Sequence, residues 1–146
     1  EEDDEDDKKM RNGMDLALCC WDLETNVLSF SGAGNPVFII REGELEAIKG
    51  DRQPIGLHKK MKPFTKHEYQ LQDGDRLYTF SDGYSDQMGG ENQDRIKLKN
   101  LKLQLTQIHT SSFSDQSKVL DSYFENWRGD MEQMDDVVVI GVQIKF

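Results

Sequence analysis

The sequence predicts an α+β fold built on antiparallel strands. Short strand patterns separated by turn residues fill most of the chain up to residue 81. Two helical patterns follow, at residues 96–109 and 112–128, and an apolar strand at 137–144 comes after them. Strands, then helices, then a last strand differ from the regular alternation that builds a parallel sheet. A chain of 146 residues is also the right size for one domain with a real core.

The first part of the chain predicts consecutive strands joined by tight connections. Residues 14–21 are apolar on both faces, which is typical of a central strand, and residues 27–31 form the return strand. Residues 32–36 contain two glycines and a proline and break that strand sharply. Residues 37–41 and 44–49 then predict a hairpin. We therefore expect an antiparallel meander.

Residues 71–88 predict a turn, a buried strand and an aspartate at the end of that strand. Asp73-Gly74 is a strong hairpin signal, because glycine tolerates the positive φ that a two-residue turn needs. A buried strand is expected at residues 76–81, and Asp82 follows it directly. Gly83 removes side-chain bulk where the chain must turn. The Asp82 carboxylate is therefore expected to point past the end of a sheet.

A second acidic motif lies near the end of the chain. Asp135 and Asp136 directly precede the strand at residues 137–144. If this strand is the antiparallel neighbour of 76–81, Asp82 and Asp135 converge at one edge of the sheet. Mg²⁺ and Mn²⁺ favour such oxygen ligands. Spacing alone leaves two interpretations open, a metal site or an ordinary turn and a polar strand entrance.

Both helical patterns are expected to pack on a sheet. Ser112 or Ser114 should cap the second helix, and Gly129 stands where a C-terminal glycine belongs. The apolar side chains at helical spacing are Leu98, Leu101, Leu105 and Ile108 in the first helix, and Leu120, Tyr123, Phe124 and Trp127 in the second. Such stripes predict core packing and no cofactor site.

Charge and cysteine content limit the kinds of partner and the cellular compartment that we expect. The net charge is −10, and residues 1–7 supply seven of the negative charges, so nucleic acid is not an expected partner. We interpret residues 1–12 as a disordered acidic segment, with calcium binding or protein docking as the alternatives, and residues 13–146 as the folded domain. Cys19 and Cys20 are adjacent on a strand and cannot easily bridge, which fits a reducing cytoplasm. No apolar run reaches the ~20 residues of a membrane span, so we expect no membrane contact.

Three motifs together carry a resemblance to a known family. They are Ser31-Gly32-Ala33-Gly34-Asn35-Pro36, Ser81-Asp82-Gly83-Tyr84-Ser85-Asp86 and Met134-Asp135-Asp136-Val137-Val138. In this order they resemble the metal-dependent protein serine/threonine phosphatases (PPM), in their bacterial SpoIIE-type branch. The resemblance runs from about residue 13 to residue 144. It implies a sandwich of two antiparallel sheets flanked by helices.

The resemblance also implies a chemistry. In the family, two Mn²⁺ or Mg²⁺ ions share a bridging aspartate and a water that attacks phosphoserine or phosphothreonine. Asp82 and Asp135 match the two aspartates that hold one metal, and we count Gly83 in the same metal site. Asp86 matches a second-shell position that acts through water, and Asp136 stands where the family has Asn or Asp. The residues expected near the site are Gly34 and Asn35.

The implied role is that of an output domain in a bacterial signalling protein. Its substrate would be a phosphoprotein, for which the family offers an anti-sigma-factor antagonist as an example. The alternative is a non-catalytic, phosphatase-like module that binds a regulatory protein. We favour the phosphatase, because a site that no longer binds metal does not require the three matching carboxylates at Asp82, Asp86 and Asp135.

The sequence departs from the family at its beginning. Nothing in residues 1–15 matches the family's Asp-Gly segment and Gly-His-Gly run, which carry the bridging aspartate and a histidine. We therefore interpret the chain as the C-terminal part of the domain, with the N-terminal portion of the fold absent and little or no activity by itself. Strands 16–21 and 137–144, which both look buried on two sides, should then be uncovered. Self-association through the uncovered sheet is expected.

Overall fold

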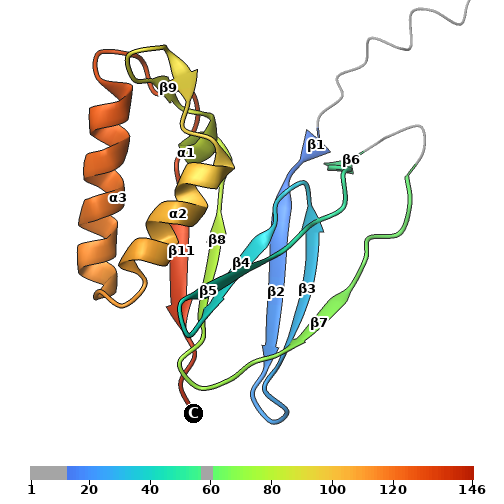
Figure 1. Cartoon of the computed structure of the whole chain (residues 1–146). Helices are drawn as coiled ribbons and strands as arrows, with labels where there is room; N and C mark the ends of the chain where they lie inside the picture. Colours follow the sequence, from blue (N-terminus) through green and yellow to red (C-terminus); the bar gives the residue numbers. More distant parts are fainter. Residues whose placement is uncertain (1–12, 57–60) are drawn as a thin grey trace, which may run out of the picture.

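Two antiparallel sheets stack face to face in the computed structural model, which describes residues 13–56 and 61–146 (Figure 1). Two helices cover the outer face of one sheet, and the second sheet lies against its other face. The predicted fold class, an antiparallel β-sandwich with flanking helices, is confirmed. The acidic segment predicted at residues 1–12 lies outside the described residues.

The helix-covered sheet has four strands. Their order is β11 (Val139–Gln143), β8 (Arg76–Phe80), β4 (Val37–Arg41) and β5 (Glu44–Ile48), and all neighbours are antiparallel. The predicted hairpin between β4 and β5 is present. Its two turn residues have positive φ, 51° at Glu42 and 87° at Gly43, which suits the right-handed twist of the strands. β11 is an edge strand of this sheet.

The second sheet has three strands, and two short strand pairs complete the structure. The order is β2 (Leu16–Asp22), β3 (Val27–Ala33) and β7 (His67–Gln70). The short pairs are β1 (Gly13–Met14) with β6 (Ile55–Gly56), and β9 (Met88–Gly89) with β10 (Asp94–Arg95). The prediction of a central strand at residues 14–21 is wrong for the described chain, because β2 lies at the edge of its sheet. The expected break at residues 32–36 begins after Ala33, later than predicted.

The helices agree closely with the sequence prediction. They are α1 (Gly83–Asp86), α2 (Leu98–Ile108) and α3 (Phe113–Arg128). Ser112 caps α3, and its hydroxyl accepts a hydrogen bond from the Asp115 amide at 3.1 Å. Gly129 ends the helix with a φ of 55°. No helix of the described residues is both long enough and apolar enough to cross a membrane.

Two apolar clusters hold the layers together. The cluster between the helices and the sheet includes Phe38, Tyr78, Phe80, Leu101, Leu105, Leu120 and Phe124. The cluster between the two sheets consists of Leu28, Ile39, Leu71, Leu77 and Ile144. Both helical stripes therefore pack in the core, as the sequence predicted.

The hairpin prediction at Asp73-Gly74 is wrong. The turn itself forms, with Gly74 at a φ of 89°, but β7 and β8 on either side of it belong to different sheets. Leu71 is buried between the sheets, so the chain crosses from one layer to the other at this point. The chain also changes sheet between β3 and β4. The meander expected in the first part is therefore a pair of hairpins in separate sheets.

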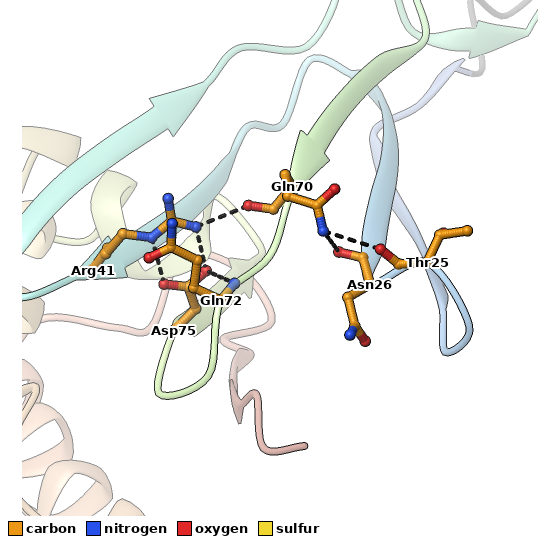
Figure 2. Close-up of polar contacts among 6 residues, drawn as sticks. All are labelled: Thr25, Asn26, Arg41, Gln70, Gln72 and Asp75. Atoms are coloured by element: carbon orange, nitrogen blue, oxygen red, sulfur yellow. Dashed lines mark hydrogen bonds and ion pairs between the residues drawn. The ribbon is translucent and has the colours of Figure 1, made fainter.

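An ion pair between the half-buried Arg41 and the buried Asp75 fixes the crossing from β7 to β8 (Figure 2). The Arg41 guanidinium donates to both carboxylate oxygens of Asp75, at 2.8 and 2.7 Å, and to the Gln70 carbonyl at 2.9 Å. The Gln72 amide donates to the same carboxylate, which is 1 % exposed. The hydrogen bonds that Arg41 donates to the Asp75 carboxylate raise the pKa of the Arg41 guanidinium. The side-chain amide of Gln70 extends the network to the Thr25 carbonyl in the β2–β3 turn.

Two edge strands expose apolar side chains. Leu18 in β2 is 57 % exposed, and Val138, Ile140 and Val142 in and beside β11 are 49, 54 and 45 % exposed. The description of both strands as buried on two sides is wrong for the described chain. The expectation that these two strands would be uncovered is confirmed.

Removing the buried carboxylate should destabilise the fold. Asp75→Ala leaves the half-buried Arg41 guanidinium and the Gln72 amide without their acceptor, and we expect a loss of about 1–3 kcal/mol in the free energy of unfolding. Urea unfolding followed by circular dichroism measures it. Glu68→Ala is the matched control, because the Lys66–Glu68 pair has the same 2.7 Å separation but is solvent-exposed. Equal effects of the two substitutions would contradict the role given to Asp75.

Candidate functional site

The predicted convergence of the two acidic motifs rests on one strand pair. β8 and β11 are antiparallel neighbours, with Phe80 opposite Val139. The end of β8 and the start of β11 therefore lie at the same end of the sheet. Asp82 follows β8 as the N-cap of α1, and Asp135 lies in the segment that leads into β11. Figure 1 shows α1 at this end of the molecule.

Ser81 ties the two segments together. Its amide donates to the Val138 carbonyl at 3.0 Å, and its hydroxyl donates to the Asp136 carbonyl at 2.8 Å. The same hydroxyl accepts from the Val138 amide at 3.0 Å. One serine thus extends the ladder between β8 and β11 up to the acidic residues. The sequence signals this role of Ser81 only by a serine at the end of a strand.

Gly83 is required by the close approach of the two segments. A Cβ at this position would overlap the Asp136 carbonyl oxygen and would lie 3.3 Å from the Asp135 carbonyl oxygen. Both are backbone atoms, so they cannot rotate away as a flexible side chain can. The absence of a side chain at Gly83 therefore allows the backbone beside Asp82 to reach the backbone of Asp135 and Asp136.

The two carboxylates are available to a ligand. Asp82 is exposed, and its side chain makes no capping hydrogen bond to α1. Asp135 is also exposed, and one of its carboxylate oxygens accepts the Asp136 amide at 2.7 Å. Its other oxygen is left for solvent or a cation. Asp136 contributes its backbone to the junction, with its carbonyl bound by Ser81.

Asp86 lies one helical turn after Asp82, and its amide donates to the Asp82 carbonyl at 2.9 Å. Its carboxylate pairs with the Arg95 guanidinium at 3.2 Å, and both side chains are well exposed. A carboxylate held by a guanidinium is less available as a direct metal ligand. This position fits the second-shell role that the resemblance implied for Asp86.

Gly34 and Asn35 connect β3 to β4 at the same end of the sheet. β4 is antiparallel to β8, so the entrance of β4 lies beside the exit of β8. Gly34 has a φ of 74°, and its amide donates to the Asp51 carbonyl at 2.8 Å. A Cβ on Gly34 would lie 2.7 Å from the carboxyl carbon of Asp15. Asp15 is therefore a further carboxylate near this end, and no sequence pattern had indicated it.

Asp82 and Asp135 lie at one end of the sheet, and the described residues add no cluster of candidate metal ligands to them. Within residues 13–56 and 61–146, no group of three or more His, Cys, Asp or Glu side chains is placed to hold a metal ion. Asp15 and Asp86 are near the site but do not complete such a group. Two carboxylates still fit a hard cation that keeps several waters in its shell.

The SpoIIE family model, described as Stage II sporulation protein E, matches residues 3–145. This chain belongs to the SpoIIE family. Three solved structures share its fold. The SiaA-PP2C domain of Pseudomonas aeruginosa is 23% identical, with a TM-score of 0.85 over 93% of this chain and 54% of that one. The search among curated proteins found no match.

The other two structures extend the comparison. The Mn-presoaked phosphatase domain of SpoIIE from Bacillus subtilis is 22% identical, with a TM-score of 0.67 over 90% of this chain and 56% of that one. The serine/threonine phosphatase PstP/Ppp of Mycobacterium tuberculosis is 16% identical, with a TM-score of 0.62 over 92% and 61%. At these identities the structures show a shared PP2C phosphatase fold. The chain spans little more than half the length of these relatives.

Adding one methyl group at Gly83 should be costly. In an ordinary helix Gly→Ala stabilises by roughly 0.5–1 kcal/mol. Here the methyl would push the Asp135–Asp136 backbone away, and we expect Gly83→Ala to destabilise by about 1–3 kcal/mol. Thermal unfolding measures this, with Ser114→Ala on the exposed first turn of α3 as the control. A stability gain in Gly83→Ala would show that the two segments do not approach as described.

Proposed function

We propose that this chain is the C-terminal part of a metal-dependent protein serine/threonine phosphatase domain. The observation that carries the proposal is the β8–β11 junction, which brings Asp82 and Asp135 to one end of the sheet in a SpoIIE family member. A structural turn needs neither a glycine in contact with the opposite backbone nor two exposed acidic residues at the same end of a sheet. A cation site accounts for both.

Asp82 and Asp135 are the residues that would hold Mn²⁺ or Mg²⁺. Their exposed carboxylates supply the hard oxygen donors that these ions prefer, and water would fill the remaining positions. When bound, the metal would supply an activated water and neutralise charge on phosphate oxygens. Gly83 and Ser81 keep the two carboxylates at one sheet end. Asp86 acts from the second shell, where it holds Arg95 beside the site.

The substrate class follows from the family. We infer a phosphoserine- or phosphothreonine-bearing protein, with an anti-sigma-factor antagonist as one candidate. The site is open to solvent at the end of the sheet, so a phosphorylated segment of another protein can reach it. The role is that of a cytoplasmic output domain in a bacterial signalling protein.

A non-catalytic module is the second candidate function. One observation favours it: the described residues add no cluster of candidate metal ligands to Asp82 and Asp135. Such a module would use the same fold to bind a regulatory protein. The presence of Asp82, Gly83, Asp86 and Asp135 together makes the phosphatase the better-supported function.

Activity should depend on sequence upstream of residue 1. We expect this chain alone to hydrolyse p-nitrophenyl phosphate with Mn²⁺ slowly or not at all. A version extended upstream through a segment with a further aspartate should be active, and Asp82→Asn should lower that activity by roughly 10- to 100-fold or more. Asp121→Asn, an exposed carboxylate on α3, is the control.

Two results would count against the proposal. Full activity of the short chain would show that catalysis does not need a further aspartate from outside this chain. An inactive extended protein that still binds a protein partner would favour the non-catalytic module.

A further inference from the structure

The segment that carries Asp135 is not held by packing or by a strand partner of its own. Residues 132–136 are all exposed, so burial of apolar side chains does not fix their position. They belong to no helix or strand of the described structure, and β11 begins only at Val139. The proposed site nevertheless needs the Asp135 carboxylate at the Asp82 end of the sheet. Contacts from the rest of the fold must therefore set the path of this segment.

Gln87 supplies such contacts. Its side-chain nitrogen donates to the Glu132 carbonyl at 2.9 Å, and its side-chain oxygen accepts the Met134 amide at 3.1 Å. The same nitrogen also donates to the Met88 carbonyl at 3.0 Å. Both polar atoms of the side chain are thus hydrogen-bonded. The bonds to Glu132 and Met134 reach the backbone directly before Asp135.

Gln87 is a polar side chain in the interior of the protein. It is 0 % exposed and lies at the C-terminal end of α1, whose N-cap is Asp82. Its own carbonyl accepts the Ile96 amide at 3.0 Å, which fixes its backbone beside the β9–β10 hairpin. A buried amide is costly unless it is hydrogen-bonded, and an apolar side chain of similar size would pack without that cost. The amide of Gln87 is therefore explained by the segment that it binds.

We propose that Gln87 is a positioning residue for Asp135. It holds residues 132–134 against the end of α1, and Ser81 holds the backbone directly after Asp135. The two side chains come from either side of Asp82 in the sequence, and the backbone groups that they bind lie on either side of Asp135. The hydrogen bonds of Gln87 lie within the chain and do not depend on sequence upstream of it. The effect on metal binding rests on the proposed function.

A second buried glutamine provides a matched control. Gln116 of α3 is 3 % exposed, and its side-chain nitrogen donates to the His109 and Ser111 carbonyls at 3.2 and 3.0 Å. Its side-chain oxygen accepts a hydrogen bond from the Tyr78 hydroxyl at 2.9 Å. Gln116 is therefore as buried and as fully bonded as Gln87, but it binds a different part of the fold.

Hydrogen exchange of the native chain tests the contact without any variant. The Met134 amide lies in an exposed segment but donates to Gln87. After correction for intrinsic rates, it should exchange roughly tenfold or more slowly than the amides of Gln133 and Asp135. A Met134 amide that exchanges as fast as these neighbours would overturn the proposal.

Replacing the glutamine tests its effect on the site. Gln87→Met fills a similar volume but can neither donate to Glu132 nor accept from Met134. Amide ¹⁵N relaxation should show residues 132–136 to be more mobile in Gln87→Met than in the native chain, and unchanged in Gln116→Met. Mn²⁺ titration, followed by the amide signals of α1, should show roughly 10- to 100-fold weaker binding for Gln87→Met. Gln116→Met should lower the melting temperature but bind Mn²⁺ as tightly as the native chain.

The outcomes separate this proposal from the proposed function. A native chain that binds no Mn²⁺ at the β8–β11 junction would contradict the metal site, and exchange and relaxation would still decide the role of Gln87. Equal effects of Gln87→Met and Gln116→Met on the mobility of residues 132–136, or on Mn²⁺ affinity, would overturn the positioning role. The exchange measurement decides the contact even where Gln87→Met does not fold.

Discussion

The contact between the exit of β8 and the entrance of β11 is the constraint on which the candidate site depends. Ser81 binds Asp136 and Val138, and Gly83 lets the opposing backbones touch. Without this junction, Asp82 and Asp135 would be two surface acids more than fifty positions apart in the sequence. With it, they occupy one end of one sheet. The chemistry proposed for the chain rests on this contact and on membership of the SpoIIE family.

The remainder of the fold holds that junction in place. The helices α2 and α3 pack on the face of β8 that carries Tyr78 and Phe80. The second sheet packs on the opposite face, through Leu77. The Arg41–Asp75 pair fixes the point where the chain enters β8 from the other sheet. β8 is therefore held on both faces and at its start, while its end remains open to solvent.

Patterns in the sequence predicted the features that depend on a few neighbouring residues, such as helix caps and tight turns. The cap at Ser112 and the turn at Gly43 follow from short motifs. The pairing of the last strand with residues 76–81 entered the prediction only as a condition, and the structure shows that pairing. The error at Asp73-Gly74 has a physical cause: a turn signal shows that the chain reverses, but not which sheet each arm joins. Ser81 and Asp15 were missed because their roles depend on contacts with segments distant in sequence.

Mn²⁺ titration of the ¹⁵N-labelled chain, followed by amide NMR, tests whether Asp82 and Asp135 hold a metal ion at the β8–β11 junction. A paramagnetic ion broadens the signals of nearby amides, so the broadened signals show which residues lie beside the bound ion. We expect the signals of residues 82–86 and 135–138 to broaden first. The double variant Asp82→Asn, Asp135→Asn should lose this broadening, whereas the double variant Asp121→Asn, Asp130→Asn should keep it. Broadening that begins at the acidic residues 1–7 and spares the β8–β11 junction would contradict this metal site.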